Sequence, residues 1–230
     1  MTEGIPARYA EVLEKTRAAA CRSGRDPKDV TLMVVSKTWP VESVRELVSL
    51  GQFCFGENRL QEGEEKVPAL PNNLSWHFIG TLQRNKVRKV LPLFPVIHSV
   101  SGVKLVRSIE RIAEEIGKKP EIYLEVNLGA EERKHGFTVE ELMQEAETLV
   151  ALKCSKIQGL MCIPPKSTAE RPARHWFSQL RKIQSQLRDR TGLSLPEMSM
   201  GMSGDYEDAI LEGATVVRVG SAIFGERGKR

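Results

Sequence analysis

The sequence predicts a single (β/α)8 barrel of the TIM type with an extra N-terminal helix. Three observations lead to this fold class. The chain has 230 residues, a length at which α/β barrels commonly form one domain. Eight short β-rich runs alternate with helical patterns, and strands joined by crossover helices pair in parallel. No composition break or long linker divides the sequence, so we expect residues 1–230 to form one domain.

The expected strands are short apolar runs. The first, Val30–Ser36, is rich in β-branched residues and almost continuously apolar, which is typical of a strand buried on both faces. In chain order, the others are Phe53–Phe55, Trp76–Ile79, Val96–Val100, Glu121–Leu128, Lys156–Ile163, Glu197–Met200 and Thr215–Val219.

The expected helices fill the intervals between these strands. Pro40 begins the first of them, which runs to Leu50, because proline favours the start of a helix and the apolar residues that follow recur at helical spacing. The next are Glu57–Val67, Leu82–Leu91, Val103–Ile116, Val139–Leu152, Ala169–Arg190 and Asp205–Leu211.

The chain ends soon after the eighth strand, which leaves little sequence for a final helix. A helix at about Ile5–Cys21, within residues 1–25, is therefore expected to pack on the barrel and cover that gap. An open doubly wound sheet is the main alternative fold. The glycine fingerprint GxGxxG that such a sheet often carries after its first strand is absent, which favours the barrel.

Composition and charge restrict the classes of function. The chain is 40% apolar and 28% charged, so it can bury a full core and remain soluble. Its net charge of +4 is compatible with an anionic small ligand and gives little support for nucleic acid. The basic run Arg84–Lys89 has no interleaved aromatic residues for base stacking, so it is interpreted as a solvated helix face.

The sequence also indicates a cellular location and a redox state. No apolar run approaches the ~18 residues of a membrane span, and the first 20 residues lack the apolar core of a signal peptide. We therefore expect a cytoplasmic protein with no membrane contact. The four cysteines show no metal-binding spacing and are expected to be buried free thiols: Cys21, Cys54, Cys154 and Cys162.

Lys37 is the clearest single candidate for chemistry. In a parallel barrel the active face lies at the carboxyl ends of the strands, and Lys37 directly follows the first strand. Desolvation by apolar walls lowers the pKa of an ammonium group, and a Schiff-base lysine needs the free amine. The alternative interpretation is a solvated lysine at the end of a strand.

The loops after the last two strands suggest an anion site. Ser203 and Gly204 open the helix after the seventh strand, and Gly220 and Ser221 follow the eighth. Barrels often bind a phosphate there, because glycine lets backbone N–H groups approach an anion. Ordinary turn glycines and capping serines are the alternative. With Lys37, such a site predicts a phosphorylated aldehyde, a description that pyridoxal 5′-phosphate (PLP) fits.

Three further residues are candidates for contacts with the cofactor ring. Arg218 lies among valines, and if it points inward it can face the pyridine nitrogen; a structural arginine is the alternative. A permanently protonated arginine would keep that nitrogen unprotonated and weaken the ring as an electron sink. Asn58 and His77 could line the ring or bond to its hydroxyl, although a lone histidine in a strand is more often a satisfied core group.

Seven segments in order along the chain resemble the pyridoxal phosphate homeostasis protein family. Together they extend over nearly the whole sequence, from about Val30 to Gly225, with minor departures at Trp39 and Gly204. The segments are Val35–Thr38, Phe55–Asn58, Trp76–Gln83, Lys134–Phe137, Gly159–Met161, Leu195–Ser203 and Arg218–Gly225.

The resemblance implies a barrel like the N-terminal domain of alanine racemase, with PLP held as an internal aldimine on Lys37. It also implies phosphate contacts from Ser203, Gly220 and Ser221, with Arg218 near the ring nitrogen. Four further positions match the family's pocket lining: Asn58, His77, Ser199 and Met200.

The function that the resemblance implies is PLP buffering or delivery by a monomer without clear catalytic activity, with apo PLP-dependent enzymes as recipients. An alternative is an amino-acid racemase or lyase using the same lysine. Racemases of this fold bring a tyrosine base from a second domain, and only Tyr206 of the three tyrosines here is near a predicted site loop. A cofactor-free Schiff-base aldolase acting on a sugar phosphate is a third possibility.

Overall fold

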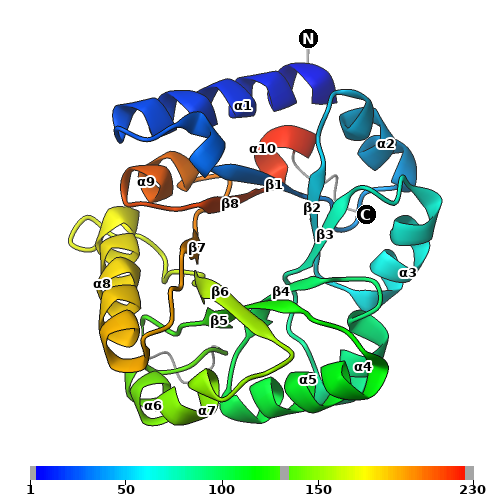
Figure 1. Ribbon diagram of the computed structural model, residues 1–230. Helices are drawn as coiled ribbons and strands as arrows, with labels where there is room; N and C mark the ends of the chain where they lie inside the picture. Colours follow the sequence, from blue (N-terminus) through cyan, green and yellow to red (C-terminus); the bar gives the residue numbers. More distant parts are fainter. Residues whose placement is uncertain (1–3, 130–134, 226–230) are drawn as a thin grey trace.

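Eight parallel strands close into one barrel in the computed structural model, which describes residues 4–129 and 135–225 (Figure 1). Each strand pairs with its neighbours in chain order, and the last pairs with the first in parallel. This confirms the predicted fold class. The strands are β1 Thr31–Val35, β2 Cys54–Glu57, β3 Ser75–Phe78, β4 Val96–Val100, β5 Glu121–Glu125, β6 Lys156–Met161, β7 Glu197–Ser199 and β8 Val216–Val219.

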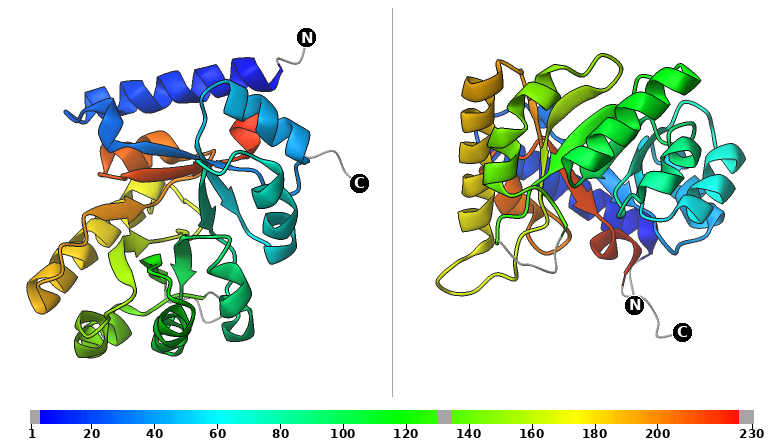
Figure 2. Two further views of the ribbon diagram at one scale, coloured as in Figure 1. Left: turned by 45° about the vertical axis from the view of Figure 1, so that its right-hand side comes forward. Right: turned by 90° about the horizontal axis from the view of Figure 1, so that it is seen from below.

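Helices surround the barrel on its outer face (Figures 1 and 2). The described α-helices are α1 Ile5–Arg22, α2 Val41–Ser49, α3 Leu60–Ala69, α4 Val87–Val90, α5 Val103–Ile116, α6 Val139–Gln144, α7 Ala146–Val150, α8 Ala173–Thr191, α9 Tyr206–Leu211 and α10 Ser221–Phe224. Two short 3-10 helices complete them, η1 Pro27–Asp29 and η2 Arg84–Lys86. The structure adds η1 and α10 to the elements expected from the sequence.

Several expected helix bounds were wrong, for identifiable reasons. The helix expected from Glu57 begins three residues later, because Glu57 completes β2. The helix expected at 82–91 is shorter and begins with a 3-10 turn. The segment 139–152 divides into α6 and α7 at Glu145, and no proline or glycine in the segment marks this break. Pro172 delays the start of α8.

Helix α1 packs against α9, α10 and α2, on the outside of the barrel next to β8 and β1 (Figure 2). The guanidinium of Arg8 donates hydrogen bonds to the carbonyls of Ile223 and Phe224 at the end of α10. The N-terminal helix thus covers the barrel where a full-length final helix would otherwise lie, as the sequence predicted.

The barrel interior is partly polar. Apolar side chains of the strands point into it, among them Met33, Val96 and Tyr123. Buried polar residues accompany them, namely His77, His98, Ser199 and Arg218. Since most barrels fill this space with branched apolar residues, the polar content of this interior needs an explanation.

All four cysteines are free, but they are not all buried. Cys54 and Cys162 are buried, whereas Cys154 is half-buried and Cys21 is exposed on the outer side of α1, so the expectation of four buried thiols was wrong. Within the described residues, no helix has the length and apolar character that a membrane span requires. Among the same residues, histidine, cysteine and acidic side chains form no group that could hold a metal ion.

Candidate functional site

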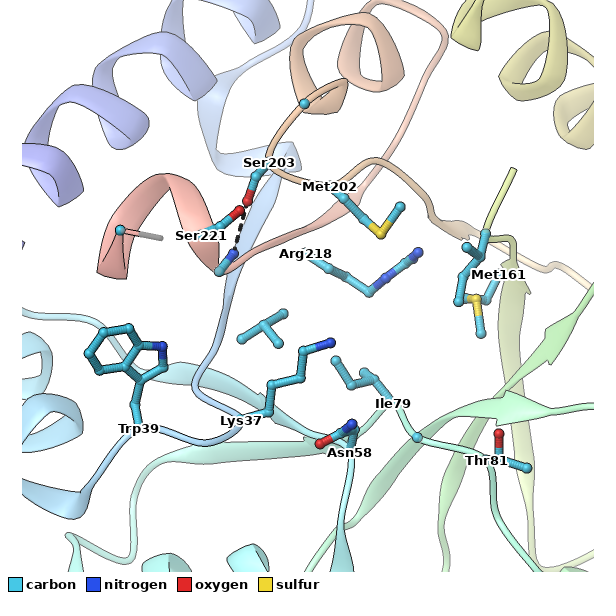
Figure 3. Close-up of a pocket in the computed structure, with 16 residues that line it drawn as sticks. Lys37, Trp39, Asn58, Ile79, Thr81, Met161, Met202, Ser203, Arg218 and Ser221 are labelled. Atoms are coloured by element: carbon cyan, nitrogen blue, oxygen red, sulfur yellow. Dashed lines mark hydrogen bonds between the residues drawn. The ribbon is translucent and has the colours of Figure 1, made fainter. Parts of the chain in front are cut away.

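A cavity of about 530 Å³ opens at the carboxyl ends of the strands (Figure 3). Its volume lies within the range of small-molecule and cofactor sites. Loops after β1, β2, β3, β6, β7 and β8 contribute to its wall. The described lining residues are Val35, Lys37, Trp39, Asn58, Ile79, Gly80, Thr81, Met161, Ile163, Met202, Ser203, Gly204, Arg218, Gly220, Ser221 and Gly225.

The structure brings together six of the nine residues expected at the site. They are Lys37, Asn58, Ser203, Arg218, Gly220 and Ser221. The other three do not line the cavity. His77 and Ser199 lie in the barrel interior behind the cavity wall, and Met200 is fully buried in the hydrophobic core. Lys134, part of one motif quoted above, lies outside the described residues.

Lys37 extends into the middle of the cavity, between Ser203 and Ser221 on one side and Asn58 on the other (Figure 3). It follows the end of β1, in a tight turn. The next residue, Thr38, has a φ of 68°, a left-handed conformation that is rare for a β-branched residue. The Lys37 loop is therefore held in a conformation that the local sequence alone disfavours.

Three ionisable side chains hold this loop, and we call them the Lys66 brace: Glu57, Glu62 and Lys66. The ammonium of Lys66 donates to Glu57 Oε1 at 2.7 Å, to Glu62 Oε2 at 2.9 Å and to the carbonyl of Ser36 at 2.8 Å. Glu62 Oε2 accepts the backbone N–H of Thr38 at 2.5 Å. The brace thus fixes the backbone on both sides of Lys37.

Two members of the brace are almost completely buried, and the third, Glu62, is 16% exposed. The side chains of Lys66 and Glu57 are 2% and 0% exposed. Burial raises the pKa of Glu57 to about 7, while hydrogen bonds from Lys66 and the Ser36 hydroxyl act in the opposite direction. Within the part of the chain that the structure describes, its second oxygen, Oε2, has no hydrogen-bond partner, which adds to the cost of the ionised form.

Arg218 forms the opposite wall and extends toward Met161 and Met202 in Figure 3. Its Nη1 donates to the Ser199 hydroxyl and its Nη2 to the Cys162 carbonyl, both at 2.8 Å. Burial lowers the pKa of Arg218, although an arginine remains protonated at neutral pH. The charges of Glu125 and Asp205 act on it from a distance, and an anion or an acceptor in the cavity would gain from its charge.

The loops after β7 and β8 meet at a third part of the wall. The Ser203 hydroxyl oxygen accepts the backbone N–H of Gly220 at 3.2 Å (Figure 3) and that of Ala222 at the same distance. Gly220 sits close to β1, and a Cβ atom there would lie 3.1 Å from the Val35 carbonyl oxygen. This arrangement gathers two hydroxyl groups and the start of α10 at the cavity edge, as an anion site requires.

Asn58 supplies the test of whether a PLP-like ligand fits. Its Oδ1 atom is buried and has no hydrogen-bond partner among the described residues, and the residue lines the cavity. A ligand with a hydroxyl donor would satisfy this oxygen. Gly80 makes the arrangement possible, since a Cβ there would lie 2.0 Å from the Asn58 carbonyl oxygen. The cavity therefore combines the amine of Lys37, the buried guanidinium of Arg218, the hydroxyl of Ser203 and the acceptor of Asn58. These groups suit the aldehyde, ring, phosphate and hydroxyl of PLP.

Sequence reasoning missed two classes of residue. The apolar side of the cavity comes from Trp39, Ile79, Met161, Ile163 and Met202, and Trp39 stacks on Phe224 with ring centroids 5.0 Å apart. Position at the strand ends could have identified these. The supporting residues Lys66 and His98 were also missed, and no local pattern marks them.

Comparisons with known proteins agree with this geometry. The family described as "Alanine racemase, N-terminal domain" matches residues 15–228. A pyridoxal phosphate homeostasis protein of Aquifex aeolicus is 40% identical over 221 residues, which cover 96% of this chain and 97% of the relative. The solved structure of PipY from Synechococcus elongatus with PLP bound is 39% identical, with a TM-score of 0.81, and the match covers 92% of this chain and 99% of that one.

A more distant structure shows a likeness of fold alone. An alanine racemase from Corynebacterium glutamicum is 15% identical, with a TM-score of 0.71. The match covers 94% of this chain and 60% of the racemase. The barrel described above therefore corresponds to a part of that enzyme.

Proposed function

Because the chain belongs to the pyridoxal phosphate homeostasis protein family, we propose that it binds PLP in the cavity at the carboxyl end of the barrel and takes part in PLP homeostasis by buffering or delivering the cofactor. The observation that carries this proposal is the convergence of Lys37, Arg218, Ser203 and the orphaned Asn58 oxygen on one cavity. When bound, PLP would supply an electrophilic aldehyde conjugated to a pyridine ring.

Lys37 would hold the cofactor covalently as a Schiff base. Its Nζ atom would be the nucleophile for the aldehyde that PLP supplies, and formation of the Schiff base would release one water molecule and need no oxidant or reductant. The Lys66 brace supports this role, because it fixes the backbone on both sides of Lys37 without placing a second amine in the cavity.

The other lining residues would bind and orient the cofactor. Ser203, Gly220 and Ser221 are the candidates for the phosphate, and Arg218 is the candidate for the ring nitrogen. Asn58 would accept a hydrogen bond from the ring hydroxyl. We expect His77, Ser199 and Met200 to make no contact with PLP, because they lie behind the wall formed by the lining residues.

A carrier function fits the titratable groups of the cavity better than catalysis does. Among the described lining residues, only Lys37 and Arg218 carry ionisable side chains. Racemisation and related proton transfers need a second group of suitable pKa, and Arg218 is too basic for that role. Tyr206 lines a neighbouring groove and not this cavity. A racemase or lyase remains the alternative function.

We also propose that the protein works as a monomer in the cytoplasm and passes PLP to apo-enzymes. The mouth of the cavity supports such a transfer, because Thr81, Ile163, Met202 and Ser221 around it are at least one-third exposed. A nucleic-acid partner is not part of this proposal. Within the basic run, Arg88 forms an ion pair with Glu115.

The decisive experiment is the absorption spectrum of the wild type and of Lys37→Ala, with and without added PLP and borohydride. We expect a yellow band in the wild type that borohydride bleaches, with the label recovered on Lys37 by mass spectrometry. Lys86→Ala, which removes an exposed lysine outside the cavity, should behave as the wild type. A wild type that stays colourless in excess PLP would refute the proposal and favour sugar-phosphate aldol chemistry.

A further inference from the structure

A continuous series of hydrogen bonds crosses the barrel interior behind Arg218. We call it the interior network, and it consists of Ser75, His77, His98, Ser199 and Arg218. Arg218 Nη1 lies 2.8 Å from Ser199 Oγ, which lies 2.8 Å from His98 Nδ1. His98 Nε2 lies 2.8 Å from His77 Nδ1. His77 Nε2 lies 2.9 Å from Ser75 Oγ and 3.5 Å from Cys54 Sγ. The series thus connects the cavity wall with the opposite end of the barrel.

The network occupies space that barrels usually fill with apolar side chains. His98 and Ser199 are fully buried, His77 is 8% exposed and Arg218 is 5% exposed. The ring of Tyr123 stacks on His98 with centroids 4.0 Å apart, which holds that ring in plane. Buried polar groups are costly unless they form hydrogen bonds. We therefore expect this fully hydrogen-bonded network to support the cavity beside it.

Burial favours the neutral form of both histidines. Burial lowers the pKa of His77 to about 4, and burial together with His77 and Arg218 lowers the pKa of His98 well below its usual value. A neutral imidazole has one donor nitrogen and one acceptor nitrogen. Each ring therefore donates at one nitrogen and accepts at the other, so the hydrogen bonds through both rings run in one direction.

The charge of Arg218 selects that direction. Arginine only donates, so Ser199 Oγ accepts from it and has its own proton available for His98 Nδ1. His98 must then donate from Nε2 to His77 Nδ1, and His77 must donate from Nε2 to Ser75. In the opposite order, His77 would donate to His98 and His98 to Ser199. The imidazole protons would then point toward the guanidinium, and the Ser199 proton would have no acceptor within the network.

We propose that His98 and His77 are positioning residues, which hold Ser199 as an acceptor and thereby fix the guanidinium of Arg218 at the cavity wall, with both rings in the Nε2–H tautomer. The Cys162 carbonyl provides the second anchor. Two anchors fix the plane of a guanidinium, whereas one leaves it free to rotate. The expected benefit to PLP binding rests on the proposed function, whereas the assignment of the tautomers does not depend on it.

The first test is nitrogen NMR of the wild type without ligand. Long-range couplings between ring protons and ring nitrogens distinguish the two neutral tautomers of each histidine. We expect His77 and His98 to be Nε2–H between pH 6 and pH 8. An Nδ1–H tautomer or a charged ring at either position would overturn the proposal. This measurement needs no variant that could fail to fold.

The second test is a set of PLP titrations that follow the absorption band. Ser199→Ala removes the acceptor of Arg218, and we expect PLP to bind about tenfold more weakly. Ser199→Thr keeps the hydroxyl and should restore binding to within about threefold of the wild type. Ser155→Ala, at a buried serine before β6 and outside the cavity, should leave the affinity unchanged.

A double variant separates positioning from a general loss of structure. If Ser199 acts through Arg218, adding Ser199→Ala to Arg218→Lys should change PLP affinity by less than about twofold. An undiminished tenfold effect in that background would overturn the positioning role. A wild type that takes up no PLP would instead refute the proposed function, and the tautomers would still decide whether the network has the direction inferred.

Discussion

Lys37 and Arg218 face the same cavity, but the side chains behind them differ in charge. Behind Lys37 lies the Lys66 brace, in which one ammonium contacts two carboxyl groups at the junction of β1, β2 and α3. Behind Arg218 lies the interior network, in which uncharged hydroxyl and imidazole groups follow a single cation. The first support is ionic, and the second is a series of neutral dipoles.

Because of this difference, we expect the two supports to respond differently to the substitution of a single residue. A buried ion pair depends strongly on each partner, because removal of one leaves the other charge uncompensated. A neutral network loses less when one member is altered, but its donor and acceptor order must be complete. We therefore expect the brace to dominate the stability of the folded chain, and the interior network to act mainly on the orientation of Arg218.

The largest expected effect is that of Lys66→Met. Methionine fills much of the same volume but leaves Glu57 and Glu62 without their shared cation. We expect the free energy of unfolding to fall by about 3–5 kcal/mol, the range found for breaking a buried pair. Urea unfolding followed by circular dichroism measures this change.

Lys15→Met is the matched control for that variant. Lys15 also pairs with a glutamate four residues earlier, Glu11, but both side chains are about half exposed. Exposed helical pairs of this kind contribute little to stability. If the two lysine variants lost similar amounts of stability, the brace could not be the stronger of the two supports.

The two regions should also give opposite dependences of stability on pH. Glu57 has a folded pKa near 7 against an ordinary value of 4.5, so between these values the folded state binds more protons than the unfolded state. The Glu57 contribution to the free energy of unfolding therefore falls as pH rises through this window. His77 has a folded pKa near 4 against 6.5, so its contribution falls as pH decreases from 6.5 to 4. Each slope is at most about 1.4 kcal/mol per pH unit.

Two substitutions separate these slopes. In Glu57→Gln, the free energy of unfolding should rise more steeply with pH than in the wild type between pH 5 and 7, because a destabilising ionisation is gone. In His77→Gln, it should rise less steeply between pH 4.5 and 6.5. Urea titrations at half-unit intervals give both curves. Two variants that ran parallel to the wild type would show that neither group titrates as described.

The sequence predicted the barrel better than it predicted these supports. The helix Val103–Ile116 was expected at its observed bounds, since its apolar spacing is regular and Gly117, with a φ of 65°, ends it. Six cavity residues were identified from the sequence because they lie at or just after the carboxyl ends of strands. The Lys66 brace was not, because the expected helix began at Glu57 and placed that residue outside β2. His77 and His98 lie on neighbouring strands, and their contact depends on a register that local patterns do not contain.

Asn58→Ala gives the smallest expected effect. It tests whether a residue can contribute to PLP affinity without contributing to the stability of the fold. Asn58 follows Glu57 of the brace and belongs to neither region, since its Oδ1 atom has no hydrogen-bond partner in residues 4–129 and 135–225. We expect PLP to bind about three- to tenfold more weakly, because the variant removes an acceptor that only the ligand would satisfy. The stability of the PLP-free protein should change by less than about 1 kcal/mol, since no protein hydrogen bond to that oxygen is lost. Absorption titrations and urea unfolding measure the two quantities, with Asn85→Ala, exposed and outside the cavity, as the control. A large loss of stability with unchanged affinity would mean that Asn58 supports the fold as the brace does, and that the ring hydroxyl of PLP has another acceptor.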